Sequence, residues 1–433
     1  MSHKGRINKN VAPQRRFCRA VLLFLLLVLM LLGSASAFAI EIPTGNEDVV
    51  LRWDNTLRYT LMYRLKSADD ALLKSPNYDD GNRNFDKGIV SNRLDILSEA
   101  DLTFKKNYGV RVSGAFWYDQ QYKNSFDNDS VATSNYFKDG VQQVNGLYKN
   151  AERYYAGPYG ELLDAFAFAK VDAGNVPLFF KLGRHVYSWG QSLLNPINGI
   201  SYAQMPLDMG KATANPGIEV KELFRPTNMA SVVAQVTPQF QLAGQYYLQR
   251  ERNRLPLEGT YFGTSDVSLD GDGYMLLYGF PVRHGRDIEA ERNKDFGLAA
   301  QWSPAALNDT TFGFYYRKFS DRMPTLILNA NGSMLPSNFT YHVAYKSEID
   351  LYGVSYAGTI FGQSVGAEVS YRQHMPLISN PAVVPLDMFL PSEGNILGAT
   401  GDTLHALVNV MGLLKKTPLW DAGNWVVEFD YNR

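Results

Sequence analysis

The sequence contains one cysteine, Cys18, and few long apolar runs. After residue 39, no run approaches the ~20 apolar residues that a membrane-spanning helix needs. The mean hydropathy of −0.23 also excludes a protein built of many such helices. A chain with a single cysteine cannot be a disulfide scaffold. With 45% hydrophobic residues the chain is not intrinsically disordered either, so burial and backbone pairing must stabilise its fold.

Histidine is also scarce. Five histidines follow residue 39, and none of them stands at a metal-binding spacing. No glycine-rich phosphate loop follows an apolar strand. The segment Asp270-Gly271-Asp272-Gly273 is similar to a calcium loop but lacks the later bidentate glutamate, so we expect an acidic external loop there. We therefore expect no metal, no cofactor and no enzymatic activity.

Residues 1–39 have the organisation of a secretory signal peptide. Residues 1–19 carry six Lys and Arg residues and no acid, and residues 20–32 form a 13-residue apolar block. Small residues then offer cleavage after Ala37 or Ala39. Thirteen apolar residues are too few for an anchor. The pair Arg15-Arg16 is compatible with twin-arginine export, but the very apolar block favours the general secretion translocon.

Removal of the signal peptide changes the charge and the cysteine content. Lys plus Arg falls from 42 to 36, while Asp plus Glu stays at 43, so the formal net charge goes from −1 to −7. Cys18 leaves with the signal peptide. The expected mature chain, residues 40–433, therefore offers no cysteine for thiol catalysis or zinc binding, and we expect no nucleic acid partner.

The first segment of the mature chain alternates between apolar and polar residues. In residues 51–65, one parity consists mostly of Leu, Trp and Tyr, and the other includes Arg52, Asp54, Arg58 and Arg64. Successive side chains of a strand point to opposite faces, so this pattern predicts a strand with one apolar and one charged face. Its length is unusual for a soluble strand and suits a tilted strand that crosses a bilayer.

The same alternation recurs along the chain and predicts thirteen strands in all. Clear examples are residues 91–104, 240–251 and 364–374. In two of the weaker examples, 161–171 and 177–187, neither parity can be assigned to the inside. The weaker examples are 109–122, 161–171, 177–187, 229–237, 296–302, 310–319, 349–360, 402–411 and 424–431.

The links between these strands decide the fold class, because short links alternate with long ones. Transmembrane β-barrels have short periplasmic turns and long external loops, whereas a soluble sandwich or propeller gives no reason for every second link to be long. Backbone groups in lipid must all be paired, so such a sheet closes on itself. We expect an all-β, antiparallel transmembrane β-barrel in the outer membrane, with many of the 26 Tyr and 24 Phe at the membrane surface.

The polar parities indicate which side chains line the lumen. A Lys or Arg on the lipid face at mid-depth costs ~2–4 kcal/mol, so charged side chains should point inward. The predicted lumen or constriction residues are Arg52, Arg58, Arg93, Asp95, Glu99, Asp101, Arg111, Gln245, Gln249, Glu251, Glu368, Arg372 and His374. Because His374 shares its parity with Glu368 and Ser370, an acid–Ser–His hydrolase site is conceivable there. We expect a polar lumen wall instead.

The end of the sequence does not fit a finished barrel. A chain that starts in the periplasm and crosses the membrane thirteen times ends on the outer side. Bacterial barrels normally have even strand numbers, which bring both chain ends to the periplasm. The sequence stops in mid-pattern at Phe429-Asp430-Tyr431-Asn432-Arg433, and an unpaired last strand exposes a row of backbone groups. We therefore expect an incomplete barrel of about thirteen strands, truncated at its C-terminus.

Several motifs resemble those of a known family. They are Leu51-Arg52-Trp53-Asp54-Asn55-Thr56, Asp80-Gly81-Asn82-Arg83-Asn84-Phe85-Asp86-Lys87-Gly88 before Ser91-Asn92-Arg93-Leu94-Asp95, Glu161-Leu162-Leu163-Asp164-Ala165-Phe166, Gly183-Arg184-His185 with Trp189-Gly190, and Asn253-Arg254-Leu255-Pro256 before Gly259-Thr260-Tyr261-Phe262. With them, essentially the whole mature chain resembles the proteobacterial outer-membrane family catalogued as domain of unknown function 1302. The resemblance implies an outer-membrane β-barrel and implies no substrate or catalytic residue.

One long link has a composition of its own. Residues 189–226 contain Pro196, Pro206, Pro216 and Pro226 and have no strand pattern. We expect the link either to fold into the lumen as a constriction or to cap the mouth outside. Charged rings and narrowings of this kind give pores their selectivity.

These features are compatible with three functions. The first is a porin-like channel for small organic solutes, hydrophobic or anionic. The second is a non-conducting barrel that serves as a partner or receptor in the transport of lipids or hydrophobic compounds. An outer-membrane hydrolase is the least favoured. The expected partners are the outer-membrane bilayer, the secretion translocon and the barrel-assembly machinery during biogenesis, and an unidentified small solute.

Overall fold

The computed structural model describes residues 40–433 except 264, 268, 270–272, 308, 334, 378–379, 387 and 419. Residues 41–433 form one compact unit. The predicted signal peptide and residues 270–272 of the predicted acidic loop lie outside the described residues.

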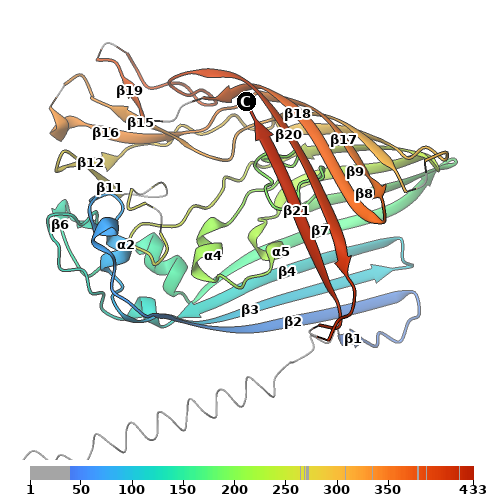
Figure 1. Ribbon diagram of the computed structural model, residues 1–433, viewed down its shortest axis with the longest axis horizontal. Helices are drawn as coiled ribbons and strands as arrows, with labels where there is room; N and C mark the ends of the chain where they lie inside the picture. Colours follow the sequence, from blue (N-terminus) through green and yellow to red (C-terminus); the bar gives the residue numbers. More distant parts are fainter. Residues whose placement is uncertain are drawn as a thin grey trace, which may run out of the picture. The chain divides into compact units, whose positions relative to one another are not determined.

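One sheet of fourteen strands, called the wall below, dominates residues 41–433 (Figure 1). Thirteen of its strands coincide with the predicted strands, which confirms the all-β antiparallel class, and β1 is additional. In order the strands are β1 (Ile40–Ile42), β2 (Val49–Arg64), β3 (Gly88–Phe104), β4 (Tyr108–Asp119), β7 (Tyr159–Ala173), β8 (Val176–His185), β9 (Thr227–Thr237), β10 (Phe240–Tyr247), β13 (Phe296–Trp302), β14 (Thr311–Phe319), β17 (Ile349–Ile360), β18 (Gln363–Pro376), β20 (Thr400–Leu414) and β21 (Gly423–Asn432).

The wall follows the chain order, so each strand pairs with the strands before and after it. Short turns join alternate pairs at one end of the wall. In the turn between β17 and β18, Phe361 and Gly362 have φ values of 50° and 77°, as in the tight turns whose twist matches that of a hairpin. Among the described residues, no hydrogen-bonded ladder joins β21 to β1 or β2, so the sheet is open along these edges.

The two faces of the wall differ in polarity. On the outer face, Leu57 is 69% exposed and Tyr63 56% exposed, and the aromatic residues Tyr59, Phe104, Phe116, Tyr246 and Tyr371 are exposed too. On the inner face, Arg93, Arg317 and Arg372 are buried. An apolar surface of this extent is stable against lipid, and apolar-out strands with long loops at one end are the architecture of outer-membrane barrels. The wall therefore spans the outer membrane. Among the described residues, no helix is long and apolar enough to cross a membrane.

A bulge explains why the inward parity of β7 could not be assigned from the sequence. Val112 pairs with Ala165, but Gly114 pairs with Leu162, so β7 has one extra residue opposite Ser113. As a result Leu163 is buried in the core, while the neighbouring Asp164 also points inward and accepts a hydrogen bond from Ser113 Oγ at 3.1 Å. A bulge of this kind reverses the alternation within one strand.

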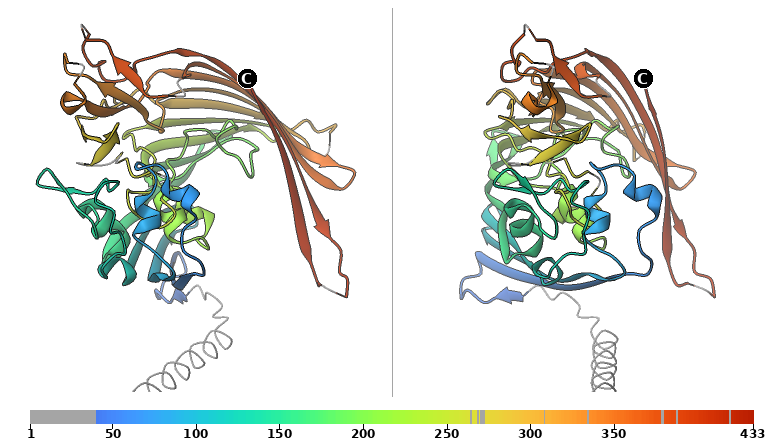
Figure 2. Two further views of the ribbon diagram at one scale, coloured as in Figure 1. Left: turned by 60° about the vertical axis from the view of Figure 1, so that its left-hand side comes forward. Right: turned by 90° about the vertical axis from the view of Figure 1, so that its left-hand side faces the viewer.

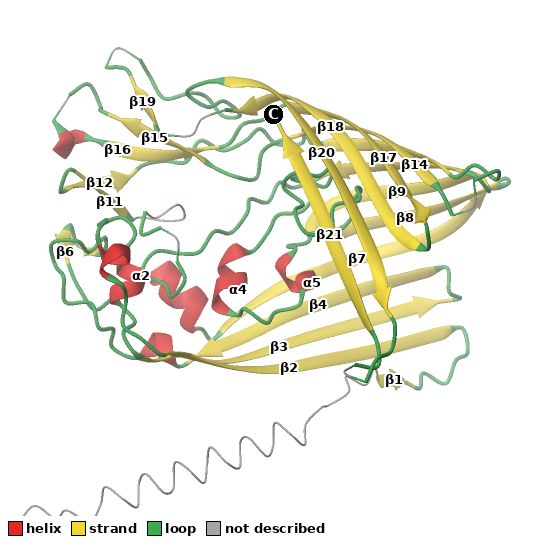
Figure 3. Ribbon diagram, in the orientation of Figure 1, coloured by secondary structure: helices red, strands yellow, loops and turns green. Residues whose placement is uncertain are grey.

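The long links build a second layer that the sequence did not predict (Figure 2, Figure 3). Its strands are short and lie inside segments interpreted as loops, so no alternation was visible. A five-stranded sheet contains β11 (Tyr274–Leu277), β12 (Phe280–His284), β16 (Thr340–Ala344), β15 (Thr325–Asn329) and β19 (Ala382–Val384), and a small hairpin contains β5 (Phe137–Lys138) and β6 (Val141–Gln142). The short helices of these links include α2 (Asp80–Arg83) and α3 (Lys149–Ala151), with single turns at Asp70–Leu73, Gln121–Lys123, Glu152–Ala156 and Pro336–Asn338.

Two buried acids join three of the long links. The backbone N–H of Asp80 donates to Asp266 Oδ2 at 2.8 Å, and the backbone N–H of Asn135 donates to Asp80 Oδ2 at 2.7 Å. Burial, together with the charge of Asp266, raises the pKa of Asp80 to about 8. Burial also raises the pKa of Asp266 to about 6. The junction is therefore formed with at least one carboxyl group protonated at neutral pH.

These shifts predict a pH-dependent junction. An acid whose pKa is raised by folding contributes stability at low pH that is lost as the pH rises toward the folded pKa. Raising the pH from about 5 to about 9 should therefore increase protease cleavage in residues 65–87 and 120–158. Asp266→Asn should reduce this pH dependence, because it removes one of the two acids. The exposed Asp129→Asn is the control, and an Asp266→Asn protein that keeps the full dependence would contradict the explanation.

Candidate functional site

The link between β8 and β9, residues 186–226, folds against the inner face of the wall, and we call it the inner segment. It contains α4 (Met209–Ala214) and α5 (Val220–Leu223), which lie on the hollow side of the wall in Figures 1 and 3. The side chain of Asp208 accepts a hydrogen bond from the Lys211 N–H at 2.8 Å and so starts α4. The sequence left two arrangements open for this link, one inside the lumen and one as a cap over the mouth. The structure places the link inside, against the inner face of the wall.

Three charged residues of β14 and β18 hold the backbone of the inner segment on one side. Glu368 accepts hydrogen bonds from the N–H groups of Gln191 and Ile200, both at 2.7 Å. Arg372 donates to the carbonyl oxygens of residues 197 and 199 at 3.0 and 2.9 Å. Arg317 donates to those of residues 200 and 202 at 3.1 and 2.6 Å. The inner face thus satisfies backbone groups that no regular secondary structure pairs.

A fourth anchor comes from β21. Glu428 accepts hydrogen bonds from the backbone N–H groups of Leu193 and Asn195, both at 2.7 Å. Nearby, the side chain of Asn198 contacts a ring nitrogen of His405 on β20 at 2.8 Å. Neither Glu428 nor His405 was predicted as a site residue, because their partners lie in a segment without a readable pattern.

The opposite side of the inner segment is bound to β2 and β3. Arg58 forms an ion pair with Glu222 at 2.7 Å. Asn215 donates to Asp95 at 3.2 Å, and Lys221 donates to Glu99 at 3.1 Å. The inner segment is therefore bonded both to the first long strands of the wall, β2 and β3, and to its last strands, β18 and β21.

A buried cluster fixes the start of α4. Lys211 is 1% exposed, forms an ion pair with Glu161 of β7, and lies 4.9 Å from the ring centroid of Trp117. Arg254, from the next long link, pairs with the same Glu161 at 3.1 Å and also with Asp208. Because every charge in this cluster has an opposite partner, the cations can stay charged although they are buried.

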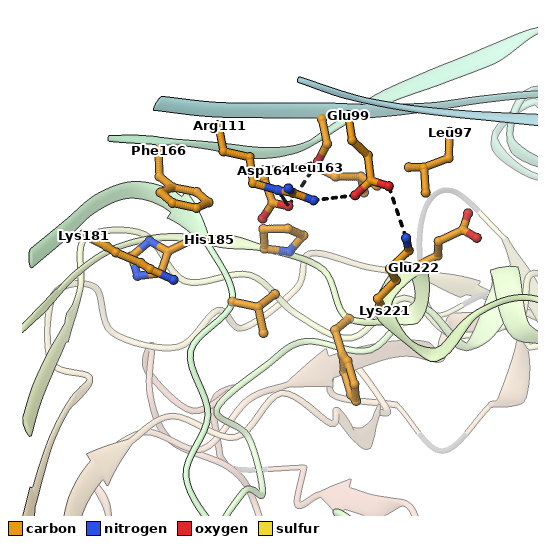
Figure 4. A pocket seen from close by; sticks show the side chains of 14 residues that line it. Leu97, Glu99, Arg111, Leu163, Asp164, Phe166, Lys181, His185, Lys221 and Glu222 are labelled. Carbon is orange, nitrogen blue, oxygen red and sulfur yellow. Dashed lines mark hydrogen bonds and ion pairs between the residues drawn. The ribbon is translucent and has the colours of Figure 1, made fainter. Parts of the chain in front are cut away.

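A cavity of about 330 Å³ lies between the inner segment and the wall (Figure 4). This volume is at the lower end of the range for small-molecule sites. Both charged and apolar side chains line it. The lining residues are Leu97, Glu99, Arg111, Ser113, Leu163, Asp164, Phe166, Lys181, His185, Val186, Lys221, Glu222, Phe224 and Pro226.

Most charges of the cavity are already paired. Arg111 binds Glu99, Asp101 at 2.7 Å and Asp164 at 3.2 Å. Burial lowers the pKa of Lys221, but the hydrogen bond and the charge of Glu99 outweigh this effect, and the pKa is raised. These ion pairs hold Arg111, Glu99 and Lys221 in place around the cavity.

The structure brings together most of the predicted lumen residues. Those that contact the inner segment or belong to the cavity network are Arg58, Asp95, Glu99, Asp101, Arg111, Glu368 and Arg372. Arg93 is buried and paired with Asp95 at 2.8 Å. Gln245 is also buried. The prediction missed Lys181, His185, Lys221 and Glu222. The first two lie on β8, whose inward parity was not readable, and the others lie in the inner segment.

Of the four remaining predicted residues, Glu251 contacts the inner segment and three lie elsewhere. Arg52 is 59% exposed in its side chain and is 3.8 Å from Glu41 beside the edge of the wall. Gln249 and Glu251 follow the end of β10, because this strand ends at Tyr247. Glu251 nevertheless forms an ion pair with Arg225 of the inner segment at 3.1 Å. His374 does not share the face of Arg372. A bulge shifts the register between Arg372 and Met375, and His374 has a φ of 63° and is exposed.

The bulge also separates the residues of the conceivable hydrolase site. Ser370 is buried, and its hydroxyl has no hydrogen-bond partner in the described part of the chain. His374 lies 3.8 Å from Asp350 instead. The acid–Ser–His arrangement is therefore not formed. Within the described residues, no group of three or more His, Cys, Asp or Glu side chains is placed to hold a metal ion.

Comparison with known proteins identifies a family. The family model described as "Protein of unknown function (DUF1302)" matches residues 18–433. No curated protein matches the chain.

Solved structures with some likeness include three proteins at low identity. An outer membrane protein of Vibrio cholerae, the loop L8 deletion mutant of OmpT, is 10% identical, with 89% of this chain and 95% of that chain covered and a TM-score of 0.30. OccK9 (OpdG) of Pseudomonas aeruginosa is 11% identical, with 89% and 93% covered and a TM-score of 0.27. OprB of Pseudomonas putida is 11% identical, with 88% of each chain covered and a TM-score of 0.26. Values this low carry no information about function.

The anchoring of the inner segment can be tested at Glu368. Glu368→Gln keeps the shape but replaces one acceptor oxygen with an NH₂ group that faces a backbone N–H. Hydrogen bonds to a buried charge are worth about 1.5–3 kcal/mol, so the inner segment should loosen and protease cleavage within residues 189–205 should increase. The control is Glu348→Gln, which changes an exposed pair with Lys294 at 3.6 Å. Equal cleavage of both variants would contradict the anchoring role.

Proposed function

Because the chain belongs to the family described as "Protein of unknown function (DUF1302)", which supplies no activity, we propose a function from the geometry of its lumen. The protein is a porin-like channel that passes small organic solutes, hydrophobic or anionic, across the outer membrane. We propose no enzymatic role for it.

The observation that carries this proposal is the cavity of about 330 Å³ between the wall and the inner segment. The inner segment narrows the lumen, and charged side chains surround the remaining space. Pores select solutes by such a combination of narrowing and charge. The ion pairs of Arg58, Arg111 and Lys221 support the proposal because they hold the lining in place.

A second candidate is a non-conducting barrel that acts as a partner or receptor in the transport of lipids or hydrophobic compounds. The observation in its favour is that the inner segment is bonded to the wall on both of its sides. It is bonded to β2 and β3 through Arg58 and Glu99, and to β14, β18 and β21 through Arg317, Glu368 and Glu428. A segment fixed in this way would hold a lumen closed.

Planar-bilayer recording of the purified full-length protein distinguishes the two. A channel should show stepwise ionic conductance. Arg111→Ala should shift the selectivity toward cations, because it leaves the carboxylates of Glu99, Asp101 and Asp164 without their shared counter-ion. Arg292→Ala, an exposed residue of a long link, is the control. A folded protein that inserts without conductance would contradict the channel and favour the second candidate.

A further inference from the structure

A second, smaller cavity of about 70 Å³ lies within the inner segment and the neighbouring long links. Its lining is mostly apolar and includes three methionines, Met205, Met209 and Met323. Two of its polar residues are already engaged: Tyr202 donates to Asp321 at 2.7 Å. Methionine side chains are flexible and polarisable, so they adapt to apolar molecules of varied shape. This cavity is suited to the apolar part of a solute.

The two cavities are lined by different parts of the molecule. The smaller one includes Asn253, Asp321 and Met323, which belong to the links at the long-loop end of the wall. The larger one includes Arg111 of β4 and Lys181 of β8, which lie within the wall. A solute that enters from the long-loop end therefore meets the apolar cavity before the charged one.

One side chain is common to both cavities. Among the described residues that line them, only Phe224 appears in each. It directly follows α5 and is half-buried, and its backbone forms an isolated bridge with Leu207. Phe224 therefore lies where the two cavities adjoin, and its backbone is held by this bridge.

Lys181 differs from the other cations of the larger cavity. Arg111 and Lys221 form ion pairs, whereas no ion pair or hydrogen bond is found for Lys181 within the described residues, and none is drawn for it in Figure 4. Its ammonium lies 5.1 Å and 5.6 Å from the ring centroids of Phe166 and Phe179. Asp164, the acid across the cavity, already binds Arg111 and Ser113. Lys181 is thus available to an external anion.

We propose that Phe224 is the barrier between the two cavities and that the transported solute is a small amphipathic anion. Its apolar part occupies the methionine-lined cavity and passes Phe224, and its anionic group is received by Lys181. This inference rests on the proposed channel function and names the class of solute. Lys181 sets the preference for the anion, and Phe224 sets the size of the apolar part that passes.

The experiment uses the full-length protein in liposomes, with swelling rates measured for three permanently charged probes. Hexanesulfonate is the amphipathic anion, methanesulfonate lacks the apolar body, and hexyltrimethylammonium has the same body with a positive charge. Phe224→Ala should increase the hexanesulfonate rate at least about threefold, because it removes the barrier. Phe224→Leu should change it less, and Phe389→Ala, at a residue that is 92% exposed, should leave it unchanged.

Lys181→Gln should lower the hexanesulfonate rate at least about threefold and leave the hexyltrimethylammonium rate unchanged or higher, because only the anion loses its partner. The matched control is Lys170→Gln. Lys170 lies 5.9 Å from the ring centroid of the same Phe179 but does not line the cavity. A Lys181→Gln protein that passes all three probes at equally reduced rates would overturn the role of Lys181.

Potassium chloride conductance separates this inference from the channel function on which it rests. If the wild-type protein conducts while Phe224→Ala and Lys181→Gln leave the probe rates unchanged, the inference is wrong and the channel stands. If the wild-type protein folds and inserts but does not conduct, the channel function itself is wrong.

Discussion

The structure depends on one constraint: backbone N–H and C=O groups in hydrocarbon must be paired within the protein, because each unsatisfied group costs several kcal/mol. Between its open edges, the wall pairs these groups in long ladders such as the one between β2 and β3, which runs from Val49–Phe104 to Arg64–Gly88 with one register shift after Met62. Period-two alternation then sends one set of side chains to lipid and the other inward. The inner face is polar because the alternation places the apolar side chains of each strand against lipid.

The polar inner face in turn determines what the inner segment can do. The inner segment has little regular secondary structure, so many of its backbone groups need partners, and Glu368, Arg372 and Glu428 supply them from the wall. Motifs that lie far apart in the sequence meet around this arrangement. Asn84 donates to the carbonyl oxygen of Gly259 at 2.8 Å, and Arg254 binds Glu161 at 3.1 Å. The family motifs thus hold the links and the inner segment to the wall.

The sequence predicted the wall well because alternation over a long strand is a direct consequence of its two environments. It failed where a bulge changes the alternation, as at Asp164 and His374, and where a strand ends early, as β10 does at Tyr247. The layer of short strands was missed because these strands pack on one another inside long links. Lys181 could be predicted to face inward only once the bulge in β7 is known, because the bulge decides which residues of β7 and of the neighbouring β8 point inward. Phe224 gives no sequence signal, because its position depends on the tertiary fold of the inner segment.

The proposed channel requires that the cavity beside the inner segment be part of a continuous path along the inner face of the wall, from one side of the membrane to the other. Residues 40–433 contain no cysteine, so a single cysteine can report on this path. In Lys181→Cys, reconstituted in vesicles of known orientation, a small membrane-impermeant thiosulfonate should react with the new thiol when added to either side. A thiol that reacts from one side only, or from neither, in a folded protein would contradict the account.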